Sequence, residues 1–251
     1  MKKIGNKYSP NNKKKESDEE DEIEEIHSYM GKKLRTDTYK IKRNLKKYKT
    51  NEELIILIES GSLAPPHKMH IGLMEIVKKY YEEKMNKKVV GGFLIPSSDF
   101  YVKYKLENDF VSLNHRVNMT KLLIKNSDWL ECLDWGLANG GEIKEHLQEI
   151  INKKFPKYKN IKCVLVFGID YYLRHKFLLK DEEVCIFRPG YDTELVKRKY
   201  PQNLIFVKGR DEVINSTSIR KAIREKNDII IKELTCKEVA DYIKNNDIFH
   251  N

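Results

Sequence analysis

The stretch from Gly61 to His70, GSLAPPHKMH, combines residue types that can bind phosphate. It follows the apolar run 54–58, so it lies where a buried strand turns into a helix. Gly61 and Ser62 permit a tight turn and a close approach of the backbone to a ligand. His67 and His70 are three residues apart, which puts both imidazoles on one side of a first helical turn. Such a turn attracts anions through its unpaired N–H groups and its positive dipole end.

Two other interpretations of this stretch stay open at the level of sequence. It matches neither the phosphate loop GxxxxGK[ST] nor the dinucleotide fingerprint GxGxxG. A metal-binding histidine pair is one alternative, although no third His, Asp or Glu ligand is obvious nearby. A helix N-terminus with two exposed histidines is the other.

A second stretch, Ile214 to Arg220 (INSTSIR), predicts a helix start rich in hydrogen-bond donors. Ser216 is a favourable N-cap, and Ser216, Thr217 and Ser218 supply hydroxyl and backbone N–H groups. Arg220 falls one turn into the helix, where it could bind a phosphate through two N–H groups. The alternative is an ordinary capped helix with a solvent-facing arginine.

Two weaker signals follow other predicted strands. The segment IPSSDFYVKYK predicts a loop in which Asp99, Lys103 and Lys105 could close over a polyanion. Gly168 and Asp170 follow a very apolar run, and a carboxylate there is well placed to accept hydrogen bonds from ribose hydroxyls. Asp170 could equally be a helix N-cap.

Apolar runs and helical periodicities alternate from residue 51 onward. Strands are predicted at 54–59, 89–95, 129–134, 161–168, 184–187 and 204–207. Helices are predicted near 68–85, 112–126, 142–153, 170–178, 192–199, 216–225 and 236–245. The alternation, with strands apolar on both faces, predicts an α/β fold with a Rossmann-like doubly wound parallel sheet and C-terminal helices. All four stretches would then lie at the edge where the strands end.

The first fifty residues differ in composition from the other 201. They hold 15 Lys or Arg against 9 Asp or Glu, and so carry +6 of the net charge of +10. Residues 1–26 are poor in apolar side chains, which predicts disorder, while 27–50 could hold one short helix. We therefore expect a charged, largely disordered extension at 1–50 and one folded domain at 51–251. Because the basic excess lies in the extension, a folded nucleic-acid-binding groove is not implied.

The sequence also restricts the cellular setting. No apolar run approaches the roughly 20 residues of a membrane span, and the N-terminus lacks the apolar region of a secretory signal. The four cysteines form no CxxC, which favours free buried thiols in a reducing compartment over a zinc site. We expect a cytoplasmic or nuclear protein with no membrane partner.

Taken together, these stretches resemble the HxGH nucleotidyltransferase superfamily, and in particular its eukaryotic nicotinamide/nicotinate mononucleotide adenylyltransferases. In chain order, the resemblance rests on HKMH at 67–70, PSSDFY at 96–101 with its following lysines, HRVNM at 115–119, DWLECLDW at 128–135, GID at 168–170, RPG at 188–190 and INSTSIR at 214–220. It extends from about residue 54 to residue 248. The histidine pair together with STxxR is specific for the superfamily, and the other segments indicate the branch.

The resemblance implies an enzyme in which the 5′-phosphate of a pyridine mononucleotide attacks the α-phosphorus of ATP. The implied products are NAD⁺, or its deamido form, and pyrophosphate, and no protein nucleophile is needed. Mg²⁺ would accompany ATP, bridge its phosphate oxygens and need few protein ligands. Family members are commonly oligomers, so a homo-oligomer is one expectation.

The resemblance also implies roles for individual residues. The charge that develops around the phosphates would be stabilised by His70, His67 and Arg220. The implied ATP-binding set is Gly61, Ser62, His67, His70, Gly168, Asp170, Ser216, Thr217 and Arg220. The implied mononucleotide-binding set is Lys103, Trp135, Phe177 and Arg188.

The chain departs from the family pattern mainly around the base-recognition pocket. Leu63 and Ala64 replace Phe-Asn, Asn215 replaces the first serine of ISST, and the segment after Trp135 offers no aromatic residue. Phe177 is the nearest candidate for a second stacking ring. These departures keep open another HxGH nucleotidyltransferase, such as one acting on phosphopantetheine, and a nucleotide-binding pseudoenzyme or chaperone. A nucleic-acid-binding function would rest only on the charge of the extension.

Overall fold

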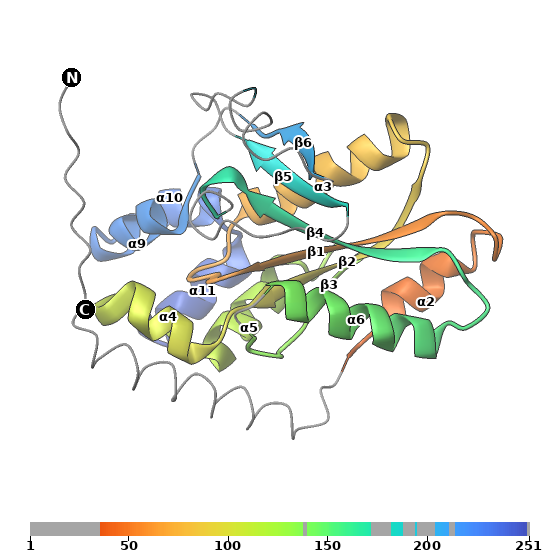
Figure 1. Ribbon diagram of the computed structural model, residues 1–251. Helices are drawn as coiled ribbons and strands as arrows, with labels where there is room; N and C mark the ends of the chain where they lie inside the picture. Colours follow the sequence, from red (N-terminus) through yellow and green to blue (C-terminus); the bar gives the residue numbers. More distant parts are fainter. Residues whose placement is uncertain are drawn as a thin grey trace, which may run out of the picture. The chain divides into compact units, whose positions relative to one another are not determined.

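Parallel strands form the central sheet in the order β3-β2-β1-β4-β5-β6. The computed structural model describes residues 36–137, 140–171, 182–187, 194, 204–210 and 214–249 (Figure 1). The strands are β1 Leu54–Gly61, β2 Lys88–Pro96, β3 Leu130–Cys132, β4 Ile161–Gly168, β5 Glu183–Phe187 and β6 Leu204–Lys208. The helices are α2 Tyr39–Leu45, α3 Lys68–Glu83, α4 Asp99–Leu106, η1 Glu107–Asp109, α5 Leu113–Leu123, α6 Gly140–Lys154, α9 Ser216–Arg224, α10 Asp228–Leu234 and α11 Lys237–Asn245.

The strand order reverses between β1 and β4. From β1 the sheet grows through β2 to β3 on one side, and from β4 it grows through β5 to β6 on the other. The predicted Rossmann-like parallel sheet with C-terminal helices is therefore confirmed. In such sheets, ligands bind outside the carboxyl ends of the strands at this switch point.

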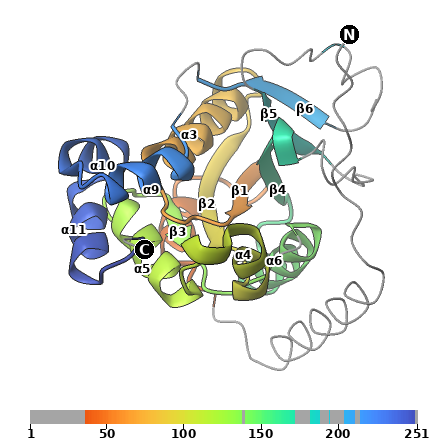
Figure 2. The ribbon, with the colours of Figure 1, turned by 90° about the vertical axis from the view of Figure 1, so that its left-hand side faces the viewer.

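Helices cover both faces of the sheet (Figure 2). Two adjacent glycines of β2 mark the two faces, because successive residues of a strand point to opposite sides. A Cβ atom at Gly91 would lie 2.4 Å from Ile41 of α2, while one at Gly92 would lie 3.0 Å from Met74 of α3. The absent side chains therefore let α2 and α3 pack closely on opposite faces.

The predicted strands are all present, although β3 is shorter than expected. Helices near 68–85, 112–126, 142–153, 216–225 and 236–245 are also confirmed, as α3, α5, α6, α9 and α11. The helices predicted at 170–178 and 192–199 lie largely outside the described residues.

One predicted element was wrong and one helix was missed. The loop expected at 95–105 contains helix α4, whose N-cap Ser98 accepts a hydrogen bond from the backbone N–H of Tyr101 at 3.2 Å. Helix α10 was not predicted at all. Both are short helices with one buried residue each, so neither leaves a helical period in the sequence.

The folded unit begins earlier than the expected boundary at residue 51. Chain contacts separate Met1–Arg35 from a unit that starts at Thr36. Within that unit, Ile41 and Leu45 of α2 are 0% and 2% exposed. The Asn44 side-chain amide donates to the carbonyl oxygen of Val90 in β2 at 3.2 Å. Residues 36–50 are thus part of the domain and not of the extension.

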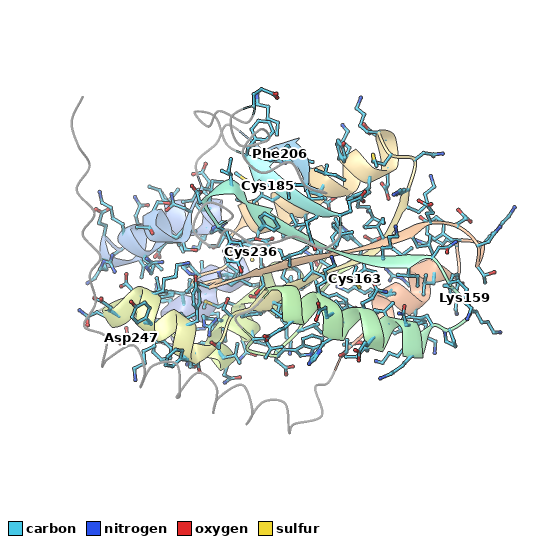
Figure 3. The ribbon with its side chains drawn as sticks, viewed as in Figure 1. Lys159, Cys163, Cys185, Phe206, Cys236 and Asp247 are labelled. Carbon is cyan, nitrogen blue, oxygen red and sulfur yellow. The ribbon has the colours of Figure 1, made fainter. Side chains whose placement is uncertain are left out.

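The four cysteines are free thiols, as predicted. Cys163 of β4 and Cys185 of β5 are buried in the sheet (Figure 3), while Cys132 and Cys236 are half-buried. Burial raises the pKa of the Cys132, Cys163 and Cys185 thiols to about 12, so they are protonated and unreactive at neutral pH. Among the described residues, no helix is both long and apolar enough to span a membrane.

Candidate active site

The carboxyl ends of β1 and β4 open onto free space. The last paired residues of these neighbouring strands are Glu59 and Val166, and two residues further each strand ends in a glycine. Among the described residues, a Cβ atom built at Gly61 or at Gly168 would meet no atom within 4 Å. The described backbone at these two strand ends is therefore uncovered, at the switch point where the sequence predicted phosphate and ribose contacts.

The two histidines of HKMH lie together at the start of α3. His67 is the N-cap residue, and its backbone N–H donates to His70 Nδ1 at 3.0 Å. The imidazole rings stack with centroids 3.7 Å apart and planes inclined by 25°. Because His70 Nδ1 accepts a hydrogen bond, the ring proton of a neutral His70 lies on Nε2.

Neither alternative for the histidine pair gains support. His67 is only 6% exposed and the His70 side chain 14%, so they are not two exposed residues of a helix start. Within the described part of the chain, no group of three or more His, Cys, Asp or Glu could hold a metal ion.

A buried carboxyl group of β1 faces the second histidine. Glu59 Oε1 lies 4.0 Å from His70 Nε2, and the Glu59 side chain is 13% exposed. Burial raises the pKa of Glu59 to about 8, so the carboxyl is largely protonated at neutral pH and places little negative charge beside the histidines. The sequence analysis missed Glu59. Its signal was an acidic residue inside an otherwise apolar strand, LIILIESG.

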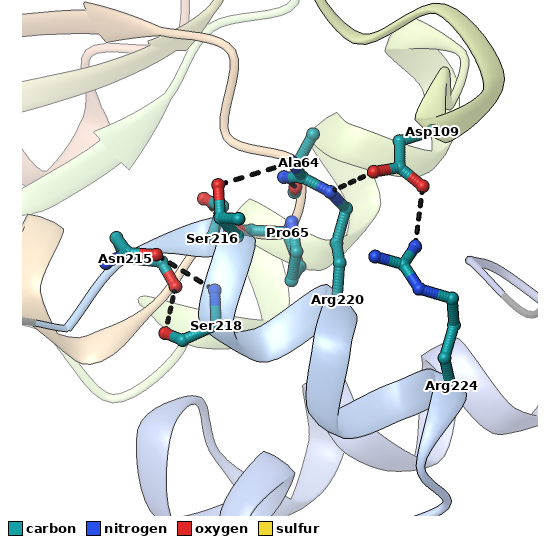
Figure 4. Close-up of polar contacts among 9 residues, drawn as sticks. Ala64, Pro65, Asp109, Asn215, Ser216, Ser218, Arg220 and Arg224 are labelled. Carbon is teal, nitrogen blue, oxygen red and sulfur yellow. Dashed lines mark hydrogen bonds and ion pairs between the residues drawn. The ribbon is translucent and has the colours of Figure 1, made fainter.

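The start of α9 docks on the loop after β1 (Figure 4). The Ser216 hydroxyl donates to the carbonyl oxygen of Pro65 at 2.9 Å. The prediction that Ser216 is the N-cap was wrong. The cap is Asn215, whose side-chain oxygen accepts from the backbone N–H of Ser218 at 2.9 Å. Asn and Ser are about equally good N-caps, so the sequence could not decide between these neighbouring residues, and the predicted cap lay one residue too late. Thr217 is exposed beside this cap.

Arg220 is buried, contrary to the alternative of a solvent-facing arginine. It is 7% exposed. Its Nε donates to Asp109 Oδ2 at 2.8 Å, and its Nη1 donates to the carbonyl oxygen of Ala64 at 2.9 Å. These bonds join α9, the loop after β1 and η1 at one point, so the two motifs of the family resemblance form one site.

The segment with Asp99 and the lysines also reaches this loop. Asp99 accepts from Arg116 Nη2 at 2.8 Å and from the backbone N–H of Leu113 at 2.5 Å. Lys105 Nζ donates to the Ser62 hydroxyl at 3.1 Å, and both Lys103 and Lys105 are exposed on α4. Lys105 therefore reaches the loop after β1.

Arg116 of the HRVNM segment is the second buried arginine of this region. It is 0% exposed. Besides Asp99, it binds the carbonyl oxygens of Val111 and Ser62, at 2.9 and 3.1 Å. Arg116 thus holds α4, the start of α5 and the loop after β1 in one arrangement. The sequence analysis did not assign it a role.

The predicted acceptor pocket is only partly described. Trp135 is 1% exposed, and its indole N–H has no hydrogen-bond partner among the residues that the structure describes. Asp170 is half-buried just after β4. Phe177 and Arg188 lie outside the described residues.

Comparisons with known proteins agree with this geometry. The sequence model of the cytidylyltransferase-like family matches residues 58–234. A nicotinamide/nicotinic acid mononucleotide adenylyltransferase 2 of Caenorhabditis elegans is 24% identical over 225 residues, which are 78% of this chain and 97% of that protein. A nicotinamide/nicotinic acid mononucleotide adenylyltransferase 1 of Bos taurus is 37% identical over 81 residues, but these cover only 32% of this chain and 27% of that protein.

A solved structure has the same fold. It is the nicotinic acid mononucleotide adenylyltransferase of Plasmodium falciparum complexed with NaAD, with a TM-score of 0.55 and 19% identity. The match covers 78% of this chain and 98% of that one.

Proposed function

We propose that this chain, which belongs to the cytidylyltransferase-like family, joins ATP and a pyridine mononucleotide to give a dinucleotide and pyrophosphate. One observation carries the proposal. The stacked His67–His70 pair and the start of α9 meet across the loop after β1, where Arg220 donates to the carbonyl oxygen of Ala64 at 2.9 Å. A site of this kind suits a polyphosphate, because imidazole, hydroxyl, guanidinium and helix N–H groups converge on it.

The reaction needs positioning and charge stabilisation more than protein chemistry. The 5′-phosphate oxygen of the mononucleotide attacks the α-phosphorus of ATP, and the bond to the pyrophosphate oxygen breaks. His70, with its Nε2 proton, is proposed to donate to the α-phosphate as negative charge develops. His67 would support the same phosphate region, and the start of α9 with Arg220 would bind the β- and γ-phosphates.

Mg²⁺ is proposed to enter with ATP. The described residues offer no cluster of carboxylates and histidines for it, so phosphate oxygens and water would supply its ligands. Its contribution would be to neutralise phosphate charge. The ribose of ATP would lie over Gly168 and bind Asp170.

The acceptor is proposed to lie beside Trp135 and α4. Relatives are named for acting on nicotinamide and nicotinic acid mononucleotides, and we extend this substrate class to the present chain. The Trp135 indole N–H would donate to the acceptor once its surroundings open, and Phe177 and Arg188 stay proposed members of the pocket. Lys103 was predicted to bind the acceptor phosphate, and we add Lys105 as a candidate because it already reaches Ser62. Cytoplasmic or nuclear location and homo-oligomeric assembly stay predictions.

The acceptor can be identified by product analysis. Purified protein would be incubated with ATP, Mg²⁺ and one of three acceptors: nicotinamide mononucleotide, nicotinate mononucleotide or phosphopantetheine. We expect a dinucleotide of the mass of NAD⁺ or deamido-NAD⁺ from at least one pyridine mononucleotide. A product from phosphopantetheine alone would leave the adenylyl transfer in place and overturn the acceptor. No product, with ATP bound, would favour the pseudoenzyme.

A further inference from the structure

One carboxylate bridges two arginines of the same helix. Asp109 lies in η1, and its Oδ2 accepts from Arg220 Nε while its Oδ1 accepts from Arg224 Nη1, both at 2.8 Å (Figure 4). The arginines are four residues apart on α9, so both guanidinium groups project toward η1 from one side of the helix. Each oxygen of the carboxylate thus serves a different arginine.

The two ion pairs differ in their surroundings. The Arg220 side chain is 8% exposed, the Asp109 side chain 23% and the Arg224 side chain 39%. An exposed pair contributes little, whereas a buried guanidinium that loses its partner is left with an uncompensated charge. The bond between Asp109 and Arg220 is therefore the important one, and Arg224 holds the carboxylate from the solvent side.

The contacts of Arg220 fix its guanidinium plane. A guanidinium group has five N–H donors in a rigid fork. Nε donates to Asp109, and one N–H of Nη1 donates to the carbonyl oxygen of Ala64. Among the described residues, the contact of Nη2 is a long one of 3.4 Å to the Thr217 hydroxyl. The bonds to Asp109 and Ala64 therefore fix the direction of Nη2, whose N–H groups can still donate to a ligand.

We propose that Asp109 is a positioning residue for the polyphosphate of ATP. It holds Arg220 so that the Nη2 end faces the phosphates, and it acts on ATP only through Arg220. This inference rests on the proposed function for the identity of the ligand. With one carboxylate and two guanidinium groups, the cluster keeps a net charge of +1, which still favours a polyanion.

The test compares Asp109→Asn with Asp109→Glu and with a control, Asp228→Asn. Asp228 forms an ion pair of 3.7 Å with Lys244 and is 56% exposed. The Kd for ATP with Mg²⁺ is measured by calorimetry, and KM is measured for both substrates. We expect Asp109→Asn to raise the Kd and the KM for ATP by about 10-fold or more, as for loss of a charge-assisted hydrogen bond. The KM for the mononucleotide should stay unchanged, Asp109→Glu should recover part of the loss, and the control should match the wild type.

A double mutant separates positioning from folding. If Asp109 acts through Arg220, adding Asp109→Asn to Arg220→Ala should change the Kd for ATP no further. Three results would overturn the inference: an unchanged Kd in Asp109→Asn, additive effects in the double mutant, or a lower Kd in Asp109→Asn. The last would mean that Asp109 competes with phosphate for the arginines. A wild type that binds ATP but forms no dinucleotide would contradict the proposed function alone, because the comparison of Kd values still decides the role of Asp109.

Discussion

His70 Nδ1 accepts from the backbone N–H of His67, and the Glu59 carboxyl group lies 4.0 Å from Nε2. The first contact fixes which ring nitrogen carries the proton, and the second places an acid next to that proton. Burial accounts for the raised pKa of Glu59, so its carboxyl group is largely uncharged beside His70 at neutral pH.

Glu59 gives a prediction for stability against pH. Its pKa is raised by burial from 4.5 to about 8. Between these values the unfolded chain has released the proton and the folded chain keeps it, so Glu59 lowers the free energy of unfolding as pH rises. Glu59→Gln lacks this titration. We expect the stability of the variant relative to wild type to increase from pH 5 to pH 8, by an amount on the order of 1 kcal/mol or more.

Urea unfolding at pH 5, 6.5 and 8 would measure this difference. Glu149→Gln is the control, because Glu149 is 69% exposed on α6. A stability difference between Glu59→Gln and wild type that stays flat over this range would contradict the assignment of a buried protonated carboxyl.

Single residues show where sequence reasoning succeeds and where it stops. His67, His70 and Arg220 could be proposed from the sequence because their residue types and spacing are part of the motifs themselves. Glu59 and Asp109 were not found, because their importance depends on contacts between segments far apart in the chain. Asp109 meets Arg220 across 111 positions, and no local pattern records such a distance.

At the scale of elements, helix α4 depends on a buried arginine of its neighbour. Arg116 of α5 binds Asp99 at the start of α4 and the carbonyl oxygen of Ser62. Replacing the buried guanidinium group by an apolar side chain leaves the Asp99 carboxylate and the carbonyl oxygens that it binds without their partner. We expect Arg116→Met to lower the free energy of unfolding by about 3–5 kcal/mol. Lys121→Met, at an exposed position of the same helix, should change it by less than about 0.5 kcal/mol.

Chemical denaturation with circular dichroism would measure both variants. If Arg116→Met unfolded at the same denaturant concentration as Lys121→Met, Arg116 would not organise α4 and the loop. Sequence patterns could not predict this arrangement. The α4 segment has a single buried residue, Val102, so tertiary bonds and the Ser98 cap decide its structure.

The strands and long helices were predictable for the opposite reason. The strand β1 buries Leu54 to Ile58 completely, and α3 buries residues at helical spacing along its length. A continuous apolar run or a regular apolar stripe must be covered by neighbouring elements, and it therefore appears in the sequence itself. The alternation of strands with helices also predicted that the sheet is parallel.

At the scale of the whole molecule, α2 packs on the sheet as part of the folded unit. Ile41 contacts the position of Gly91, and the backbone N–H of Lys40 donates to Glu131 at 2.9 Å. A chain beginning at residue 36 should keep the thermal midpoint of the full chain. A chain beginning at residue 51 should lose several kcal/mol of stability, because burying each of Ile41 and Leu45 contributes about 1.5–3 kcal/mol.

Calorimetry of the two shortened chains would test this boundary, with Ile41→Ala in the full chain as a matched variant. Equal thermal midpoints for the two shortened chains would mean that the folded domain begins at residue 51, as the sequence predicted. Composition placed the domain boundary too late because residues 36–50 are as basic as residues 27–35. The packing of α2 depends on three buried residues, which leave little trace in the composition.

The central claim is that His70 takes part in adenylyl transfer at the switch point of the sheet. The most direct measurement is the rate of pyrophosphate release from ATP and Mg²⁺ with nicotinamide or nicotinate mononucleotide, in wild type, His70→Ala and His146→Ala. His146 lies on α6 and serves as the control. We predict that His70→Ala lowers kcat by about 10²–10³ with an unchanged thermal midpoint, while His146→Ala keeps the wild-type rate. A His70→Ala variant with wild-type kcat would contradict the account.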